Sequence, residues 1–229
     1  MGMYLNPGNS GFTRIRNDIY VDKSGLISLI NETIETPRLL TCVSRPRRFG
    51  KSFAAKMLCA YYDKTCDSSA LFDDLAIAQD EKFNKTYRQH LNQYDVIYLD
   101  MTNVLGKADS DSIVPFIQNS VTEELLEAYP DLKVGNVFDE TLLHTAELTG
   151  NKLIMIIDEW DAPIRETPKS QKPYLDFLRT LFKSSGTTDQ IFAAAYMTGI
   201  LPIKKDGSQS AISDFKEFTV IKPRKFFKI

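Results

Sequence analysis

The sequence is poor in the residues that build metal centres and cross-links. Its 229 residues include three cysteines and two histidines, and Cys42, Cys59 and Cys66 form no CxxC pair. This scarcity argues against a zinc site and favours a reducing, cytoplasmic setting. No apolar run approaches the ~20 residues of a membrane-spanning helix, and the N-terminus lacks the apolar core of a signal peptide. We therefore predict a cytoplasmic protein without a membrane span.

The chain also lacks an excess of charge of one sign. Its 28 basic and 30 acidic residues give a net charge of −2, which argues against a generally basic nucleic-acid binder but leaves a local patch open. The hydrophobic content of 43% and the charged content of 25% are those of an ordinary globular protein. The length suits one large domain or two small ones, with ample chain for a core.

The most informative stretch is residues 45–52, Arg-Pro-Arg-Arg-Phe-Gly-Lys-Ser, between an apolar run and a helix-like segment. Strand, tight loop, Gly-Lys-Ser and helix in that order are typical of a phosphate-binding loop. Gly50 lets the backbone pass close to a phosphate, Lys51 adds positive charge, and the Ser52 hydroxyl suits Mg²⁺. Arg45 stands where the consensus G-x-x-x-x-G-K-[ST] has its first glycine. The alternative interpretation is an ordinary basic loop that caps a helix.

The remaining chain alternates between strand and helix patterns. A continuous apolar run, as at residues 152–157, indicates a strand buried on both faces, which is typical of a parallel sheet. The alternation predicts an α/β fold with a mostly parallel sheet. We expect residues 1–10 to form an unpacked arm, 19–21 to be β-prone, and 67–81 to be mixed and rich in turns. The predicted strands cover residues 39–43, 94–100, 152–157, 191–199 and 218–221, and the predicted helices cover 26–34, 51–63, 112–129, 138–148 and 174–185.

Two adjacent carboxylates, Asp158 and Glu159, follow the buried strand. Open α/β sheets bind ligands at the carboxyl ends of their strands, and neighbouring carboxylates repel each other unless a cation relieves them. We expect Asp158 to orient a Mg²⁺ held by Ser52 and the phosphates, and Glu159 to polarise the attacking water as a general base. The alternative is a solvated strand end that caps the following turn.

Other candidates are more ambiguous. Thr198 ends a predicted strand, so its hydroxyl could reach a γ-phosphate or the lytic water, or it could simply be a β-former. Arg47 and Arg48 flank the phosphate site and could add charge-assisted hydrogen bonds, or they could pair with Asp or Glu across the domain. Asp161 is interpreted mainly as the start of a turn. The basic tail 222–229 carries interleaved aromatic residues and is interpreted as a linker.

At these residues the chain resembles the bacterial AAA-ATPase-like family, which are predicted P-loop ATPases of the additional-strand type. The family's loop favours Arg-Pro-Arg-Arg-Phe-Gly-Lys, so Arg45 is an expected replacement of the first glycine. The resemblance spans nearly the whole chain, and its matching stretches are residues 20–27, 45–52, 158–163, 197–200 and 213–215.

The resemblance implies a five-stranded sheet of order 5-1-4-3-2 with helices on both faces. It implies that Asp158 is the Walker B aspartate, Glu159 the catalytic glutamate and Thr198 the sensor residue. Family members usually continue into a helical lid and often a restriction-endonuclease-like domain, so we expect the chain to be part of a longer protein. The expected parts are an N-terminal arm and helix at 1–37, an ATPase core at 38–221, and the tail at 222–229.

The predicted function is that of an ATP-binding domain that hydrolyses ATP with Mg²⁺ to drive conformational change in a larger protein. A nucleotide-dependent switch with little turnover is the first alternative. A small-molecule kinase is the second, and a glutamate after the Walker B aspartate disfavours it because it suits water as the acceptor. Contacts with nucleic acid and oligomerisation stay open. The predicted catalytic residues are Lys51, Glu159 and Thr198, the metal ligands are Ser52 and Asp158, and the cofactor-binding residues are Arg47, Arg48, Phe49, Gly50, Lys51, Ser52 and Phe53.

Overall fold

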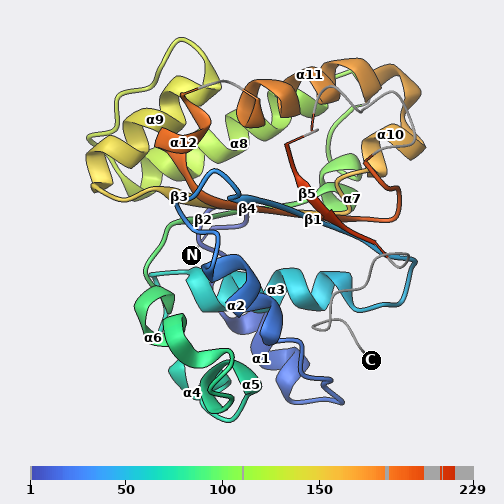
Figure 1. Cartoon of the computed structure of the whole chain (residues 1–229). Coiled ribbons are helices and arrows are strands. Elements are labelled where there is room, and N and C mark those ends of the chain that lie inside the picture. Colours follow the sequence, from blue (N-terminus) through green and yellow to red (C-terminus); the bar gives the residue numbers. More distant parts are fainter. Residues whose placement is uncertain (1, 110, 184–185, 204–211, 213, 220–229) are drawn as a thin grey trace.

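A five-stranded parallel sheet runs through the centre of the molecule (Figure 1). The computed structural model describes residues 2–109, 111–183, 186–203, 212 and 214–219. Their strand order is β2-β3-β4-β1-β5, which confirms the predicted order 5-1-4-3-2. The strands are β1 (Leu40–Ser44), β2 (Val96–Asp100), β3 (Leu153–Asp158), β4 (Phe192–Gly199) and β5 (Lys216–Phe218).

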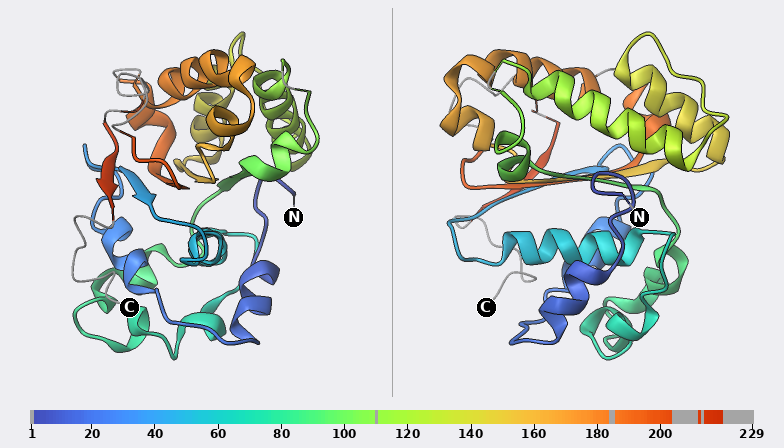
Figure 2. Two further views of the ribbon diagram at one scale, coloured as in Figure 1. Left: turned by 90° about the vertical axis from the view of Figure 1, so that its right-hand side faces the viewer. Right: turned by 180° about the vertical axis from the view of Figure 1, so that it is seen from behind.

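Helices cover both faces of this sheet, and the views from the side and from behind show the same two layers (Figure 2). One layer contains α1 to α6 and the other contains α7 to α12. The first comprises α1 (Ser10–Arg16), α2 (Gly25–Asn31), α3 (Lys51–Tyr62), α4 (Ser69–Phe72), α5 (Ala76–Gln79), the 3₁₀ turn η1 (Asn84–Thr86) and α6 (Tyr87–His90). The second comprises α7 (Met101–Leu105), α8 (Ile113–Ala128), α9 (Phe138–Thr149), α10 (Ala162–Glu166), the 3₁₀ turn η2 (Pro168–Ser170), α11 (Gln171–Phe182) and α12 (Thr188–Ile191).

The two layers explain the continuous apolar strands. Successive side chains of a strand point to opposite faces of a sheet. In β3, Leu153, Met155 and Ile157 pack in the core on the α8 and α11 side, whereas Ile154 and Ile156 pack in the core that contains α3. Since both faces are covered, both sets of side chains are apolar and buried, as predicted for a parallel sheet.

The prediction of an unpacked N-terminal arm is wrong. Tyr4 and Leu5 are buried, and the arm runs antiparallel to β2, with Leu5 opposite Ile97. The amide of Tyr98 donates to the carbonyl of Tyr4 at 2.7 Å, and that of Asn6 donates to the strand at 2.8 Å. Because β2 ends the sheet on this side, its outward backbone groups need partners. The arm supplies them.

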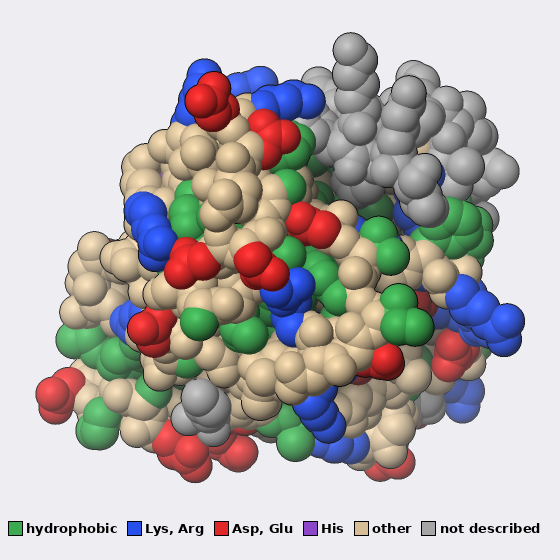
Figure 3. Space-filling view, turned by 90° about the horizontal axis from the view of Figure 1, so that it is seen from below, with side chains coloured by type: hydrophobic (Ala, Val, Ile, Leu, Met, Phe, Trp, Pro, Cys, Tyr) green, Lys and Arg blue, Asp and Glu red, His purple; other side chains and the backbone are tan. Residues whose placement is uncertain are grey.

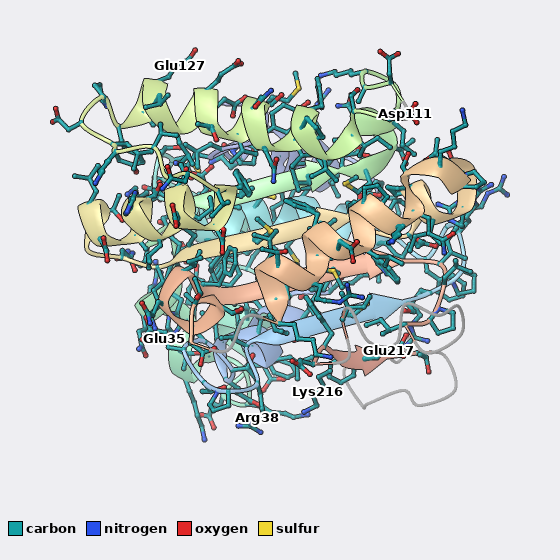
Figure 4. The ribbon with its side chains drawn as sticks, turned by 90° about the horizontal axis from the view of Figure 1, so that it is seen from above. Glu35, Arg38, Asp111, Glu127, Lys216 and Glu217 are labelled. Atoms are coloured by element: carbon teal, nitrogen blue, oxygen red, sulfur yellow. The ribbon has the colours of Figure 1, made fainter. Side chains whose placement is uncertain are left out.

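The carboxylate of Glu124 on α8 ties this arm down. It accepts the backbone N–H groups of Met3, Tyr4 and Leu5 at 2.8, 2.8 and 2.6 Å. Glu124→Ala leaves these donors without their acceptor, so we expect the free energy of unfolding to fall by about 1–2 kcal/mol in a urea titration. Glu127→Ala is the matched control, because Glu127 is exposed farther along α8 (Figure 4). Equal losses in the two variants would contradict this role of Glu124.

Several local predictions need correction. Residues 19–21 form no strand. Residues 67–81 are mixed, as predicted, with the short helices α4 and α5 separated by turns. Within the described residues the last strand is Lys216–Phe218, which begins two residues before the predicted start at 218, and residues 220 and 221 of that prediction lie outside the described residues. This strand lies at the sheet edge far from α8 (Figure 4). The tail 222–229 lies outside the described residues.

The surface formed by the α1–α6 layer carries both signs of charge. Lysine and arginine side chains alternate there with aspartate and glutamate, without a broad region of one sign (Figure 3). This mixture agrees with the net charge of −2. In the part of the chain that the structure describes, no helix has the length and apolar character needed to cross a bilayer.

Candidate functional site

Three polar side chains lie at the carboxyl edge of the sheet, on three neighbouring strands. Asp100 of β2 lies opposite Asp158 of β3, and Asp158 lies opposite Thr198 of β4. Asp158 and Thr198 each come two residues after a side chain of the α3-side core, Ile156 and Tyr196 respectively. The two-residue period of strands therefore points both toward α3. The structure thus brings together two residues that are 40 positions apart in the sequence.

The loop between β1 and α3 faces this edge. Its first amide, at Arg45, donates to the carbonyl of Gly199 at 3.0 Å, so the loop starts beside the end of β4. Arg48 and Gly50 have φ angles of 68° and 71°, in the left-handed region. At Gly50 a Cβ atom would also lie 2.6 Å from the Nζ atom of Lys23, so this position favours glycine. The loop therefore turns tightly onto the N-terminus of α3, where free N–H groups and the helix dipole favour an anion.

Lys51 connects this loop to the end of β3. Its Nζ atom donates to the carbonyl of Pro46 at 3.1 Å and lies 3.3 Å from the Oε1 atom of Glu159. The side chain is buried, with 5% of its surface exposed. The predicted phosphate-binding lysine and the predicted general base are thus in direct contact.

Glu159 has an unusual backbone conformation. Its φ angle is 52°, in the left-handed region that costs a non-glycine residue about 1 kcal/mol or more. The following amide, of Trp160, donates to the carbonyl of Thr198 at 2.9 Å and attaches the turn to β4. The turn redirects the Glu159 carboxylate away from the line of the strand and onto Lys51. Strained residues of this kind cluster at functional sites.

Asp158 is a buried carboxylate with an unsatisfied oxygen. It is 1% exposed, and its Oδ1 atom has no hydrogen-bond partner among the described residues. Burial raises the pKa of Asp158 to about 6, and the nearby hydroxyl of Ser52 acts in the opposite direction through a hydrogen bond. The carboxylate of Asp100 raises this pKa further. Such a group is suited to a cation, because a bound positive charge relieves both its burial and its repulsion.

The protein donors near Asp158 are few. No group of three or more His, Cys, Asp or Glu side chains that could hold a metal occurs within the described residues. A cation at Asp158 and Ser52 would therefore depend on further oxygens from phosphate and water. That pattern fits Mg²⁺, which keeps several waters and binds through one or two protein groups plus phosphates.

Asp161, interpreted from the sequence mainly as a turn residue, is a buried polar hub. Its side chain is 0% exposed and accepts the amide of Leu201 at 2.9 Å and that of Ile200 at 3.2 Å. It also accepts the Nε–H of Arg165 at 2.9 Å. The Nη2 atom of Arg165 reaches the Oε2 atom of Glu159 at 3.1 Å. Arg165 is absent from the residues predicted from the sequence, although its position four residues after Asp161 on α10 is a recognisable signal.

Gly199 explains how closely this region is packed. A Cβ atom there would lie 2.5 Å from the Oδ1 atom of Asp161 and 2.7 Å from the indole Nε1 atom of Trp160. Trp160 is 1% exposed and belongs to the core on the α8 side. The only tryptophan therefore packs between the end of β4 and this core.

A cleft of about 400 Å³ adjoins the loop on its other side. Apolar side chains that line it are unusually exposed: Ile19 is 90% exposed, Val21 59%, Phe53 49% and Phe49 39%. Lys23 also lines it and donates from Nζ to the carbonyl of Phe49 at 2.6 Å. Burial and then the charge of Arg45 lower the pKa of Lys23. The full lining is Ile19, Tyr20, Val21, Lys23, Arg48, Phe49, Gly50, Phe53, Ala54 and Met57.

A family model described as a predicted AAA-ATPase matches residues 7–208. The chain belongs to the predicted AAA-ATPase family. Among curated protein sequences, none matches it.

One solved structure shares the fold of this AAA-ATPase chain at low sequence identity, and a second is similar at a lower score. The ORC2 protein of Aeropyrum pernix, solved as ADPNP–ADP complexes, matches with a TM-score of 0.52 and 12% identity, over 90% of this chain and 51% of that chain. PCH-2 of C. elegans matches with a TM-score of 0.42 and 14% identity, over 98% of this chain and 50% of that chain. The AAA-ATPase chain thus spans about half the length of each.

This AAA-ATPase domain has the P-loop fold of the additional-strand type, with the phosphate-binding-loop strand β1 beside β4. Apart from Arg47, its predicted site residues lie in two groups. Lys51, Asp158, Glu159, Ser52 and Thr198 lie at the junction of α3 with the sheet edge. Arg48, Phe49, Gly50 and Phe53 line the apolar cleft, whereas the exposed Arg47 does not line it.

Proposed function

We propose that this AAA-ATPase domain binds ATP or ADP at the N-terminus of α3 and hydrolyses ATP with Mg²⁺. The observation that carries the proposal is the contact between Lys51, the first residue of α3, and the carboxylate of Glu159, which directly follows β3, at 3.3 Å. A phosphate-binding cation and a general base in one place are what hydrolysis of a phosphoanhydride needs. The ADPNP–ADP complexes of the ORC2 protein, which shares the fold, support the ligand class.

The cleft beside the loop suits the base of the nucleotide. It is continuous with the phosphate end, because Gly50 and Phe53 belong both to the cleft lining and to the start of α3. Its volume of about 400 Å³ lies in the range of small-ligand sites. Exposed Ile19 and Val21 would lose contact with water against a planar aromatic ring. With the base of the nucleotide in the cleft, the phosphates would lie at Lys51.

The residues at the sheet edge divide the chemistry. Ser52 and Asp158 would hold Mg²⁺, which neutralises phosphate charge when bound. Lys51 stabilises negative charge on the phosphates, and Glu159 accepts a proton from the attacking water. The hydroxyl of Thr198 positions this water or the terminal phosphate. Each role requires only side chains already gathered within this site.

Asp161 connects the site to the chain that follows β4. Asp161 holds the backbone of Ile200 and Leu201, which directly follow β4. A shift of the turn that carries Glu159 and Asp161 would therefore be transmitted to the chain after β4. We propose that this transmission drives conformational change in a larger, cytoplasmic protein. The expected boundaries of the core, 38–221, belong to the same proposal.

Removal of the Lys51 charge tests nucleotide binding. Lys51→Ala is expected to weaken ATP or ADP binding by about tenfold to hundredfold, because a charge-assisted phosphate bond contributes about 1.5–3 kcal/mol. Isothermal titration calorimetry measures the change. Lys56→Ala on the same helix is the matched control and should keep the wild-type affinity. Equal affinities of wild type and Lys51→Ala would remove the loop from the site.

A further inference from the structure

A continuous series of ion pairs crosses the candidate site. Lys51 Nζ lies 3.3 Å from Glu159 Oε1, and Glu159 Oε2 lies 3.1 Å from Arg165 Nη2. Arg165 Nε lies 2.9 Å from Asp161 Oδ2. Each carboxylate oxygen of Glu159 therefore faces a different cation, one from α3 and one from α10.

The two ends of this series of ion pairs, Asp161 and Lys51, are held differently. At one end, Asp161 is 0% exposed and is fixed by the backbone amides of Ile200 and Leu201. This places Arg165, which is 18% exposed, on a rigid support. At the other end, Lys51 has a long, flexible stem, and its ammonium also donates to the carbonyl of Pro46 in the loop. Lys51 can therefore turn away from Glu159 more easily than Arg165 can.

A phosphate that approaches Lys51 competes with Glu159. Both are anions, and at about 3 Å a lysine ammonium interacts strongly with either one. If Lys51 turned to the phosphate and Glu159 had no second cation, a largely buried carboxylate would remain uncompensated beside a new negative charge. Arg165 prevents this, because it already contacts the other oxygen of Glu159.

We propose that Arg165 is a positioning residue that retains the Glu159 carboxylate when Lys51 transfers to the nucleotide phosphates. The proposal rests on the proposed function, since it requires phosphates at Lys51. It assigns Asp161 the role of anchoring Arg165. Arg165 thereby eases phosphate binding and keeps Glu159 beside the site where water attacks.

A double-mutant cycle on ATP affinity tests this proposal without any need for turnover. Arg165→Met keeps much of the side-chain stem but removes the charge, so Glu159 holds Lys51 alone and ATP should bind about five- to twentyfold more weakly. Glu159→Gln removes the competing charge, so ATP should bind as tightly as to wild type or more tightly. In the Glu159→Gln background, Arg165→Met should change the affinity by less than about twofold.

Controls separate positioning from a loss of structure. Arg165→Lys keeps a cation near Glu159 and should recover part of the lost affinity, whereas Arg179→Met on α11 should leave it unchanged. Thermal unfolding of each variant identifies any that fails to fold, and Arg165→Lys then stands as the second probe. If Arg165→Met weakens ATP binding equally with and without the Glu159 charge, the proposal is overturned and nucleotide binding stands. If the wild-type chain binds no ATP, the proposed function itself fails.

Discussion

Replacement of Glu159 by glutamine is expected to lower phosphate release from ATP by about 10²–10⁴-fold while nucleotide stays bound. Glutamine keeps the size of the side chain but cannot accept a proton from water. The structure supports this choice of base, because Glu159 leaves the strand in a left-handed turn and contacts Lys51 at 3.3 Å. Single-turnover assays on the bound complex measure the chemical step apart from binding.

A neighbouring glutamate provides the control for this experiment. Glu166 pairs with the same Arg165 at 3.1 Å but has a side chain that is 48% exposed. Glu166→Gln should hydrolyse ATP at close to the wild-type rate. Wild-type hydrolysis by Glu159→Gln would show that Glu159 is not the base. If the wild-type chain binds ATP and releases no phosphate with water as the acceptor, the nucleotide switch becomes the better description.

The strands of the sheet could be predicted because each has a recognisable pattern in its own short stretch of sequence. Residues 153–157 and 96–99 are apolar runs of strand length, and each is followed by a carboxylate, Asp158 and Asp100 respectively, where its strand ends. The strand order itself came from the family resemblance, since nothing in a single strand states which neighbour it pairs with. The structure confirms that order.

The N-terminal arm could not be predicted from local sequence. Its burial depends on the unpaired edge of β2 and on Glu124, which is about 120 residues away in the chain. Local patterns report turns and propensities, and they carry no information on such distant partners. The β-prone residues 19–21 show the reverse case. They have strand-forming side chains but line a cleft instead of joining the sheet.

The site shows the same division. Asp158 and Thr198 were predictable because each ends a strand, and parallel strands end at one edge. Arg165 and Lys23 were missed because their roles follow from three-dimensional contacts: Arg165 with Glu159, and Lys23 with the carbonyl of Phe49. The position of Arg165 four residues after Asp161 is a local signal, but its salt bridge with Glu159, six positions away across a strained turn, has no simple periodic signature.

Asp158 is expected to destabilise the folded chain at neutral pH in the absence of Mg²⁺ and nucleotide. Burial raises its pKa from the ordinary value of 3.8 to about 6. Between these two values the folded chain holds a proton that the unfolded chain has released, so the free energy of unfolding falls as the pH rises through this window. Each pH unit between the two pKa values corresponds to about 1.4 kcal/mol, so above pH 6 the buried charge lowers the free energy of unfolding by about 3 kcal/mol.

Asp158→Asn removes this cost, so the variant should unfold with a free energy about 1–3 kcal/mol higher than wild type at pH 8 and nearly the same at pH 4. Urea titrations in chelator-containing buffer at both pH values measure the difference, and Asp131→Asn, at an exposed position, should show no such pH dependence. The same substitution should weaken Mg²⁺-dependent nucleotide binding, because the amide supplies less negative charge to a cation. An equal effect of Asp158→Asn on stability at both pH values would show that the buried charge is not its cause. Higher stability together with weaker Mg²⁺-dependent nucleotide binding in Asp158→Asn would indicate that the charge of Asp158 destabilises the fold but is needed to bind the ligand.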